Sequence, residues 1–347
     1  MATERTKDDR CARSRYADPT LTVDARAHAC DPSPTKGIAI SRRFKVVLAF
    51  ALVYVFWGST YLGIRIAVGR IPPILMAGVR FLIAGGLMLG FCVLTGRRIT
   101  LRRDQLWRLA VIGVLLLSIA NAILAWAELS VPTGLAALIV AITPIWFLVI
   151  DGWILGAGER VGGSGIAGVA LGAAGMIVLL WPKLTTSHPL GWWELLAASS
   201  LLVSSFSWAF GSVLARRWDV KVDPLVGSGW QMAIAGAVNV VAGLALGNGR
   251  RAVWDARGLG AILYLVVFGS WVGYSAYVWL LRHVPTAKVA TYAYVNPIVA
   301  VLLGWLFLDE SIDRFILLGT AIILPAVALV SRAETTPPAV AEVEPPS

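Results

Sequence analysis

Charged residues are scarce in this chain of 347 residues, since Asp, Glu, Lys and Arg together make up only 14% of it. Soluble domains carry about 25% charged and about 45–50% apolar residues, whereas 58% of this chain is hydrophobic. A soluble fold of this length has too little interior to bury so much apolar surface. The composition therefore excludes a soluble globular protein and indicates an integral membrane protein surrounded by the lipid bilayer.

Residues suited to catalysis or metal binding are few as well. The three histidines, His28, His188 and His283, lie in the polar N-terminal segment or between apolar segments. Enzyme chemistry inside a membrane needs buried histidines, paired acids, metal ligands or a nucleophile with its base, and no H-E-x-x-H motif or acid cluster occurs. A G-x-x-x-x-G-K-[ST] run is also missing, which argues against ATP as the driving force. We therefore expect no catalytic residue, no metal and no cofactor.

Ten apolar segments are long enough to cross a bilayer, which takes about 20 residues in a helix. Short linkers separate them, so successive helices are expected to run antiparallel. The polar ends, residues 1–44 and 332–347, are expected to be disordered cytoplasmic tails, and the first of them lacks the apolar core of a secretory signal. The segments cover residues 45–68, 72–95, 106–129, 133–153, 162–181, 191–214, 225–247, 258–281, 286–308 and 313–331.

Basic residues set the expected orientation of these segments. The net charge of +10 is not concentrated in one block, so no nucleic-acid partner is expected. Instead, thirteen Lys and Arg residues flank the segments on the side of the N-terminus and six on the opposite side. Because Lys and Arg accumulate on the cytoplasmic side, both termini are predicted to be cytoplasmic; the basic loop at 247–258 is the exception.

A sequence repeat divides the chain into two units, residues 45–181 and 191–331. VPTGLAALIVAITP begins at Val131 and VPTAKVATYAYVNP at Val284, 153 positions apart, while Gly85 matches Gly236 at an offset of 151. Each unit holds five predicted helices, and an odd number forces the second unit to enter the membrane upside down. Inverted repeats of this kind are characteristic of secondary transporters. The predicted fold is an all-α integral membrane protein with ten transmembrane helices in two inverted-topology five-helix repeats.

Two prolines, Pro144 and Pro297, fall in the middle of matching helices of the two units. A proline removes a backbone donor and frees a carbonyl one turn earlier. Paired interruptions of this kind are the best sequence indication of a transporter binding site near the midplane. Thr143 and Asn296, which directly precede the prolines, would offer polar groups to a ligand there.

Ionisable side chains inside spanning helices are costly and usually functional or paired. Arg80 lies about two turns into the second span, and we expect it in the cavity, either in a structural pair or holding an anionic group. Arg65 and Glu128 lie near the outer ends of the first and third spans. They either form a cluster or extend to the interface, and Glu128 is the most accessible candidate for a proton site.

Aromatic residues are numerous, with 15 Trp in the chain. Most will face lipid or pack between helices, and a minority are expected to line a cavity and enclose an amphipathic ligand. The candidates for the cavity are Trp57, Trp126, Trp208, Tyr274 and Tyr292.

The fifth span carries a G-x-x-x-G pair at Gly168 and Gly172. Such a pair lets helices approach closely. It serves either packing inside the bundle, which we favour, or a homodimer.

The order and duplication of several short motifs resemble the drug/metabolite transporter superfamily, specifically proteins with paired EamA-type domains. The motifs are WGSTYLGIR from Trp57, PP followed by R-F-L-I-A-G from Pro72 to Gly85, T-P at Thr143, G-E-R at Gly158, VNP at Val295 and LDE at Leu308. The resemblance covers residues 45–331, although the family usually has Lys where Arg65 stands. It implies a cavity between two halves that opens alternately to each side of the membrane.

Together these features predict a secondary transporter of small metabolites in a bacterial plasma (inner) membrane. The resemblance favours export of amino acids or related compounds by alternating access, through a cavity lined by spans 1–4 and 6–9, with spans 5 and 10 peripheral. Coupling to protons, exchange and simple facilitation all stay open. The alternatives are a membrane-embedded enzyme and a non-transporting scaffold or sensor.

Overall fold

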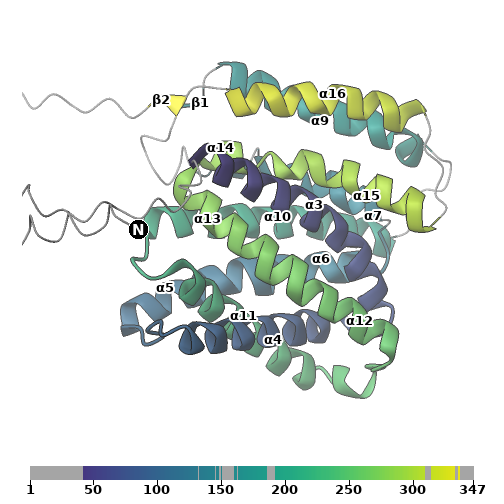
Figure 1. Cartoon of the computed structure of the whole chain (residues 1–347). Helices are drawn as coiled ribbons and strands as arrows, with labels where there is room; N and C mark the ends of the chain where they lie inside the picture. The colour runs from purple at the N-terminus through teal and green to yellow at the C-terminus, as the bar shows by residue number, and fades with distance from the viewer. Residues whose placement is uncertain are drawn as a thin grey trace, which may run out of the picture. The chain divides into compact units, whose positions relative to one another are not determined.

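The computed structural model describes residues 42–131, 133–144, 146–147, 150, 160–161, 163–185, 192–308, 314–332 and 335–336. Most of the predicted tails at 1–44 and 332–347 lies outside the described residues; the described parts are residues 42–44 at the start of α3, Arg332 at the end of α16, and residues 335–336 in a short strand. Most of the G-E-R and LDE motifs also lies outside the described residues. Figure 1 shows that the described chain is helical apart from one short ladder, in which β1 (Arg160–Val161) pairs antiparallel with β2 (Thr335–Thr336).

Six helical segments among the described residues are long and apolar enough to cross a bilayer. They correspond to the first, second, third, sixth, seventh and eighth predicted spans, so the expectation of a helical membrane protein is confirmed. The segments are α3 (Arg42–Val68), α4 (Pro73–Leu94), α5–η1–α6 (Arg103–Gly113, Val114–Ala120, Asn121–Ala127), α10 (Trp192–Trp218), α11 (Pro224–Ala245) and α12–η3–α13 (Ala256–Tyr264, Leu265–Tyr274, Ser275–His283).

The other predicted spans are described only in part. The count of ten helices extends into residues outside the described ranges and stays a prediction. The elements that are described are α7 (Thr133–Val140), α9 (Gly163–Thr185), α14 (Thr286–Val289), α15 (Tyr292–Leu308) and α16 (Arg314–Arg332), together with the short loop helix η2 (Asn248–Arg250).

Helices α4 and α11 have matching ends. Pro73 and Pro224 occupy their first positions, where the fixed φ of proline suits a helix start and its missing N–H costs no hydrogen bond. Gly96 and Gly247 follow the helix ends with φ of +73°, a left-handed conformation that glycine adopts at little cost. The members of each pair are 151 positions apart, which is the offset of the sequence repeat.

The same two helices pack against each other along their lengths. Gly85 faces Ala233 and Gly236 faces Leu82, so the contacts run in opposite directions along the two chains. A Cβ atom at Gly236 would lie 2.2 Å from the backbone nitrogen of Leu82. Small residues allow membrane helices to approach backbone to backbone, and α4 and α11 form an antiparallel pair of this type.

Helix α9, which carries the G-x-x-x-G pair, lies alongside α16, as Figure 1 shows. Within α9, a Cβ atom at Gly172 would come 3.0 Å from the ring of Tyr294, and one at Gly175 would meet Ile323. These glycines therefore face other helices of the same chain, in agreement with the packing role that we favoured for them.

One π-helical stretch interrupts the third helix of each sequence repeat. The two stretches are η1 and η3, and they begin at Val114 and Leu265, again 151 positions apart. A π-helical turn widens the backbone ladder and occurs frequently at functional sites. The stretch η3 bears directly on the cavity described below.

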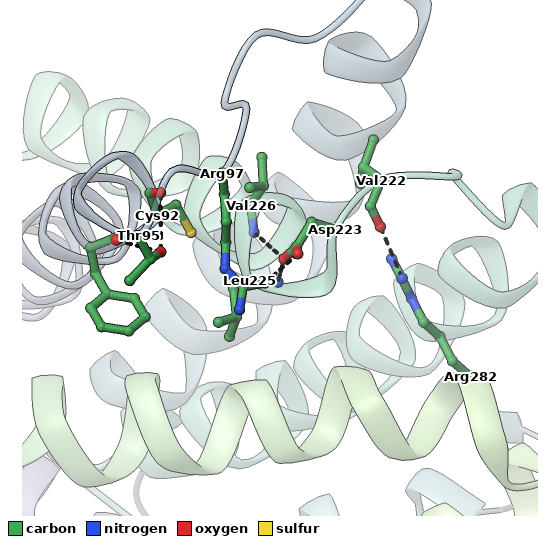
Figure 2. Close-up of polar contacts among 9 residues, drawn as sticks. Cys92, Thr95, Arg97, Val222, Asp223, Leu225, Val226 and Arg282 are labelled. Atoms are coloured by element: carbon green, nitrogen blue, oxygen red, sulfur yellow. Dashed lines mark hydrogen bonds and ion pairs between the residues drawn. The ribbon is translucent and has the colours of Figure 1, made fainter. Parts of the chain in front are cut away.

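Polar contacts join the connections at the predicted cytoplasmic end, shown in Figure 2. Arg97, which follows α4, forms an ion pair with Asp223, and Asp223 also caps α11 by accepting from the backbone nitrogen of Leu225 at 2.9 Å. On the other side of this connection, Nη1 of Arg282 donates to the backbone oxygen of Val222 at 3.1 Å. The Arg97–Asp223 pair is partly exposed, so it positions the connection and contributes only about 0–1 kcal/mol of stability.

Candidate functional site

A cavity of about 80 Å³ lies among seven of the eight spans predicted to line it. Its walls come from α3, α4, η1, α6, α7, α10, η3 and α15, and neither α9 nor α16 contributes a described lining residue. The seventh predicted span, α11, was expected to line the cavity, but no described residue of α11 lies on the cavity wall. The lining residues are Trp57, Thr60, Tyr61, Ile64, Arg80, Phe81, Leu117, Ala120, Asn121, Leu124, Val140, Ser204, Ser205, Trp208, Gly269, Tyr274, Tyr292 and Asn296.

Arg80 is the charged residue of this wall, and only 5% of it is exposed. Its Nε donates to the hydroxyl of Ser270 at 3.1 Å, and its guanidinium carbon lies 4.7 Å from the centre of the Phe81 ring. No carboxylate pairs with Arg80 among the residues described. Buried charges are normally paired or hydrogen-bonded throughout, so this guanidinium has spare capacity for an anion in the cavity.

Two glycines of η3 provide the space for Arg80 and Trp57. A Cβ atom at Gly269 would lie 2.6 Å from Nη2 of Arg80, and one at Gly273 would lie 2.5 Å from Nε1 of Trp57. The backbone oxygen of Gly269 also accepts from Nε1 of Trp57 at 3.0 Å. The π-helical stretch thus holds both side chains against the cavity by close backbone approach.

Trp57 belongs to an aromatic cluster that comprises Trp57, Trp208, Tyr277 and Tyr292. The ring of Trp57 lies 5.3 Å from that of Trp208, 4.9 Å from that of Tyr277 and 5.1 Å from that of Tyr292. Nε1 of Trp208 donates to the hydroxyl of Tyr277 at 3.1 Å. Tilted and edge-on contacts at such distances stabilise aromatic pairs by about 0.5–1.5 kcal/mol each, so the cluster forms a rigid wall.

The two prolines behave differently from each other. Helix α7 ends at Val140, four residues before Pro144. The ring of a proline clashes with the carbonyl group four residues earlier, which here is that of Val140. Pro297 lies inside α15, and the break in that span comes earlier, between α14 and α15. The hydroxyl of Thr143 donates to Val140 and is buried away from the cavity.

Asn296 does reach the cavity wall. It is 4% exposed, and its Oδ1 accepts no hydrogen bond from any described residue. Tyr274 and Tyr292 also line the cavity, and the hydroxyl of Tyr274 donates to Oε1 of Gln231 at 2.6 Å. An unsatisfied buried acceptor beside a cavity is free to bind a donor on a ligand.

Arg65 and Glu128 lie together near the C-terminal ends of α3 and α6. Nη1 of Arg65 donates to the backbone oxygen of Glu128, so the contact involves the main chain and not the carboxyl group. Trp126, two residues earlier, is 37% exposed and does not line the cavity. Glu128, which directly follows α6, is buried, in contrast to Trp126.

The sequence reasoning missed several polar residues of the wall, namely Thr60, Tyr61, Asn121, Ser204 and Ser205. Several of their groups already have partners in the protein. The hydroxyl of Ser204 donates to the backbone oxygen of Ala120 on another helix at 2.8 Å, and Nδ2 of Asn121 donates to the backbone oxygen of Leu116 at 2.8 Å. Hydroxyl and amide residues inside otherwise apolar spans are the signal that would have found them.

We expect Gly269→Ala to weaken binding of an anionic ligand without unfolding the protein. The added methyl meets the end of the flexible Arg80 side chain at 2.6 Å, so Arg80 must move away from the cavity. A loss of about 1.4 kcal/mol corresponds to a tenfold rise in Kd, measurable by isothermal titration once a substrate is known. Gly260→Ala is the matched control, because nothing lies within 4 Å of its Cβ. Equal affinities of the two variants would contradict the placement of Arg80.

Comparison with known proteins places this architecture in a family. The sequence matches the EamA-like transporter family over residues 44–181 and again over residues 192–332. It is 38% identical over 294 residues to the "Uncharacterized inner membrane transporter YedA" of Escherichia coli, covering 83% of this chain and 92% of that protein. A chloroplastic WAT1-related protein of Arabidopsis thaliana is 27% identical over 289 residues, covering 80% of this chain and 67% of that protein.

The fold agrees with this relationship. A solved crystal structure superimposes with a TM-score of 0.70 at 18% sequence identity, covering 84% of this chain and 97% of that chain. Likeness at this level concerns the fold alone, whereas the two family matches cover most of the sequence. The chain is therefore a member of the EamA-like transporter family.

Proposed function

We propose that the protein is a secondary transporter that exports small metabolites bearing a carboxylate, amino acids or related compounds, across the bacterial plasma membrane. The single observation that carries the substrate class is Arg80, a buried cation on the cavity wall to which no described carboxylate is bonded. An anionic group of the substrate would complete its coordination, since a guanidinium binds carboxylates through two parallel hydrogen bonds.

The rest of the wall supports a zwitterionic substrate. Oδ1 of Asn296 is an unsatisfied acceptor, suited to an ammonium group. The rings of Trp57, Trp208 and Tyr292 lie on the same wall, and aromatic faces attract cations within about 6 Å. An amino acid carries both a carboxylate, for which Arg80 is suited, and an ammonium group, for which Asn296 and these rings are suited.

Alternating access between two inverted five-helix repeats, residues 45–181 and 191–331, is the proposed mechanism. It is supported by elements that recur at the repeat offset, α4 with α11 and η1 with η3, and by the antiparallel packing of α4 on α11. In such repeats the two halves move around a site near the midplane. The Lys and Arg distribution supports cytoplasmic termini.

The experiment that tests transport is efflux from proteoliposomes loaded with a pooled panel of amino acids, sugars and nucleosides, read by mass spectrometry against protein-free vesicles. We expect selective loss of one or a few compounds with a free carboxylate. Selective loss of neutral sugars or nucleosides would contradict the role of Arg80. Absence of any selective loss with folded protein would contradict unaided transport and favour the scaffold that the sequence left open.

A further inference from the structure

Glu128 is a buried acid that the proposed binding site does not use. It directly follows α6, and its exposed fraction is 0%. Neither of its carboxyl oxygens, Oε1 or Oε2, has a hydrogen-bond partner among the residues that the structure describes. Buried polar atoms are almost always hydrogen-bonded, so an unpartnered carboxyl group requires an explanation.

The charged and titratable neighbours of Glu128 lie mainly on α3. Arg65 donates to the backbone oxygen of Glu128 and also acts on its carboxyl group through space. Tyr61, one turn earlier on α3, lies within electrostatic reach of the same carboxyl group. Tyr61 also lines the cavity, so a side chain of the cavity wall lies within electrostatic reach of the acid.

Helices α4 and α10 also pack against α6. On α4 the basic residue is Arg80, already placed in the cavity wall, while α10 carries Glu194 in its first turn and Arg216 and Arg217 in its last. Ala127, Val131 and Leu201 belong to one buried apolar cluster at this end of α6. Arg65 is therefore the cation that the structure places next to Glu128.

This environment makes the conformation sensitive to a proton. An ionised carboxylate without hydrogen bonds costs several kcal/mol in a protein interior, whereas the neutral carboxyl group costs much less. The described conformation, which buries Glu128, is therefore favoured when the proton is bound. A conformation that exposes this end of α6 to water would accept the ionised form, so proton binding shifts the population between the two.

We propose that Glu128 is the proton-binding site that couples export to the proton gradient, an inference that rests on the transport function proposed above. In each cycle one proton from the outer side adds to the ionised carboxylate and gives a neutral carboxyl group. The same proton leaves Glu128 towards the cytoplasm after the cavity has reopened inwards. One proton thus enters for each substrate molecule that leaves, and no other bond forms or breaks.

Two flux measurements on purified full-length protein in proteoliposomes test this coupling, with a labelled mixture of the standard amino acids as probe. The first is exchange of labelled for unlabelled amino acids at equal pH on both sides. The second is accumulation driven by an imposed pH gradient. We expect Glu128→Gln to keep exchange within about twofold of wild type and to lose gradient-driven accumulation at least tenfold, because glutamine cannot take up and release a proton.

The matched control is Asp255→Asn, which removes a partly exposed carboxylate paired with Arg70 and should leave both fluxes unchanged. Gradient-driven accumulation by Glu128→Gln at the wild-type rate would overturn the coupling role while transport itself stands. Wild-type protein without exchange would overturn the transport function, and the coupling role with it.

A measurement on wild-type protein covers the case in which Glu128→Gln does not fold. Vesicles that hold a pH-sensitive dye and the amino-acid mixture report proton movement opposite to the flow of amino acids down their gradient. Amino-acid flow with no accompanying proton movement would overturn the proposal.

Discussion

Replacing Arg80 with methionine is expected to abolish substrate binding at physiological concentrations while leaving the protein folded. Arg80 is buried at the cavity wall, and among the described residues its guanidinium bonds the Ser270 hydroxyl through Nε, so its other nitrogens are left for a carboxylate. Truncating one partner of a buried, hydrogen-bonded charge pair costs about 2–5 kcal/mol. At about 3 kcal/mol the Kd rises roughly 100-fold, which isothermal titration or the KM of transport will show.

The Arg80→Met substitution should weaken substrate binding without lowering the stability of the empty protein. A buried cation without a paired anion is a cost in the empty protein, and apolar residues of similar volume are often neutral or stabilising in its place. We therefore expect the Tm of Arg80→Met, measured without substrate, to equal or exceed that of wild type. A protein that loses both binding and stability would indicate a structural role for Arg80 instead.

Two further variants separate charge from geometry at this site. Arg80→Lys keeps the charge but not the planar fork of donors, so its Kd should lie between those of wild type and Arg80→Met. Arg70→Met removes an exposed arginine that pairs with Asp255, and its Kd should not change. Equal binding of a carboxylate substrate by Arg80→Met and Arg70→Met would disprove the assignment of Arg80.

Much of the candidate site could be predicted because its residues break the apolar pattern of their helices. Arg80 and Asn296 are polar residues in apolar spans, and Trp57 and Trp208 recur at the repeat offset; all four line one cavity. Trp126 was named with them as an aromatic candidate for the cavity, yet its side chain is exposed. In a helix that is apolar all round, hydrophobic periodicity does not show which face points inwards.

For the fold, the positions of helices could be predicted from the sequence, but the contacts between them could not. Hydropathy located α4 at 72–95, within a residue of Pro73–Leu94 at each end, because a helix in lipid must be apolar throughout its length. Hydropathy carries no information on which helices touch, and the pairing of α4 with α11 depends on glycines at particular faces. The π-helical stretches were also missed, since a π-helical turn has no distinct composition.

Glycine at position 85 is expected to be indispensable for folding, in contrast to its neighbour Gly86. A Cβ atom at Gly85 would lie 2.3 Å from the backbone nitrogen of Ala233 on α11, so any side chain must force two helix backbones apart. Overpacking of this kind costs about 1–3 kcal/mol or more, and membrane helices that associate through small residues cannot recover it by repacking.

We therefore expect Gly85→Leu, at about 3 kcal/mol, to lower the Tm by roughly 6–12 °C, since 1 kcal/mol corresponds to about 2–4 °C in a domain of 150–250 residues. A larger cost would prevent recovery of monodisperse protein in size-exclusion chromatography. Gly86→Leu is the matched control one residue away, because nothing lies within 4 Å of its Cβ. That variant should be as stable as wild type or more so, since glycine inside a helix costs about 1 kcal/mol. Tm values for the two variants within a few degrees of each other would contradict the close contact between α4 and α11, and with it the strongest support for an inverted pair of units.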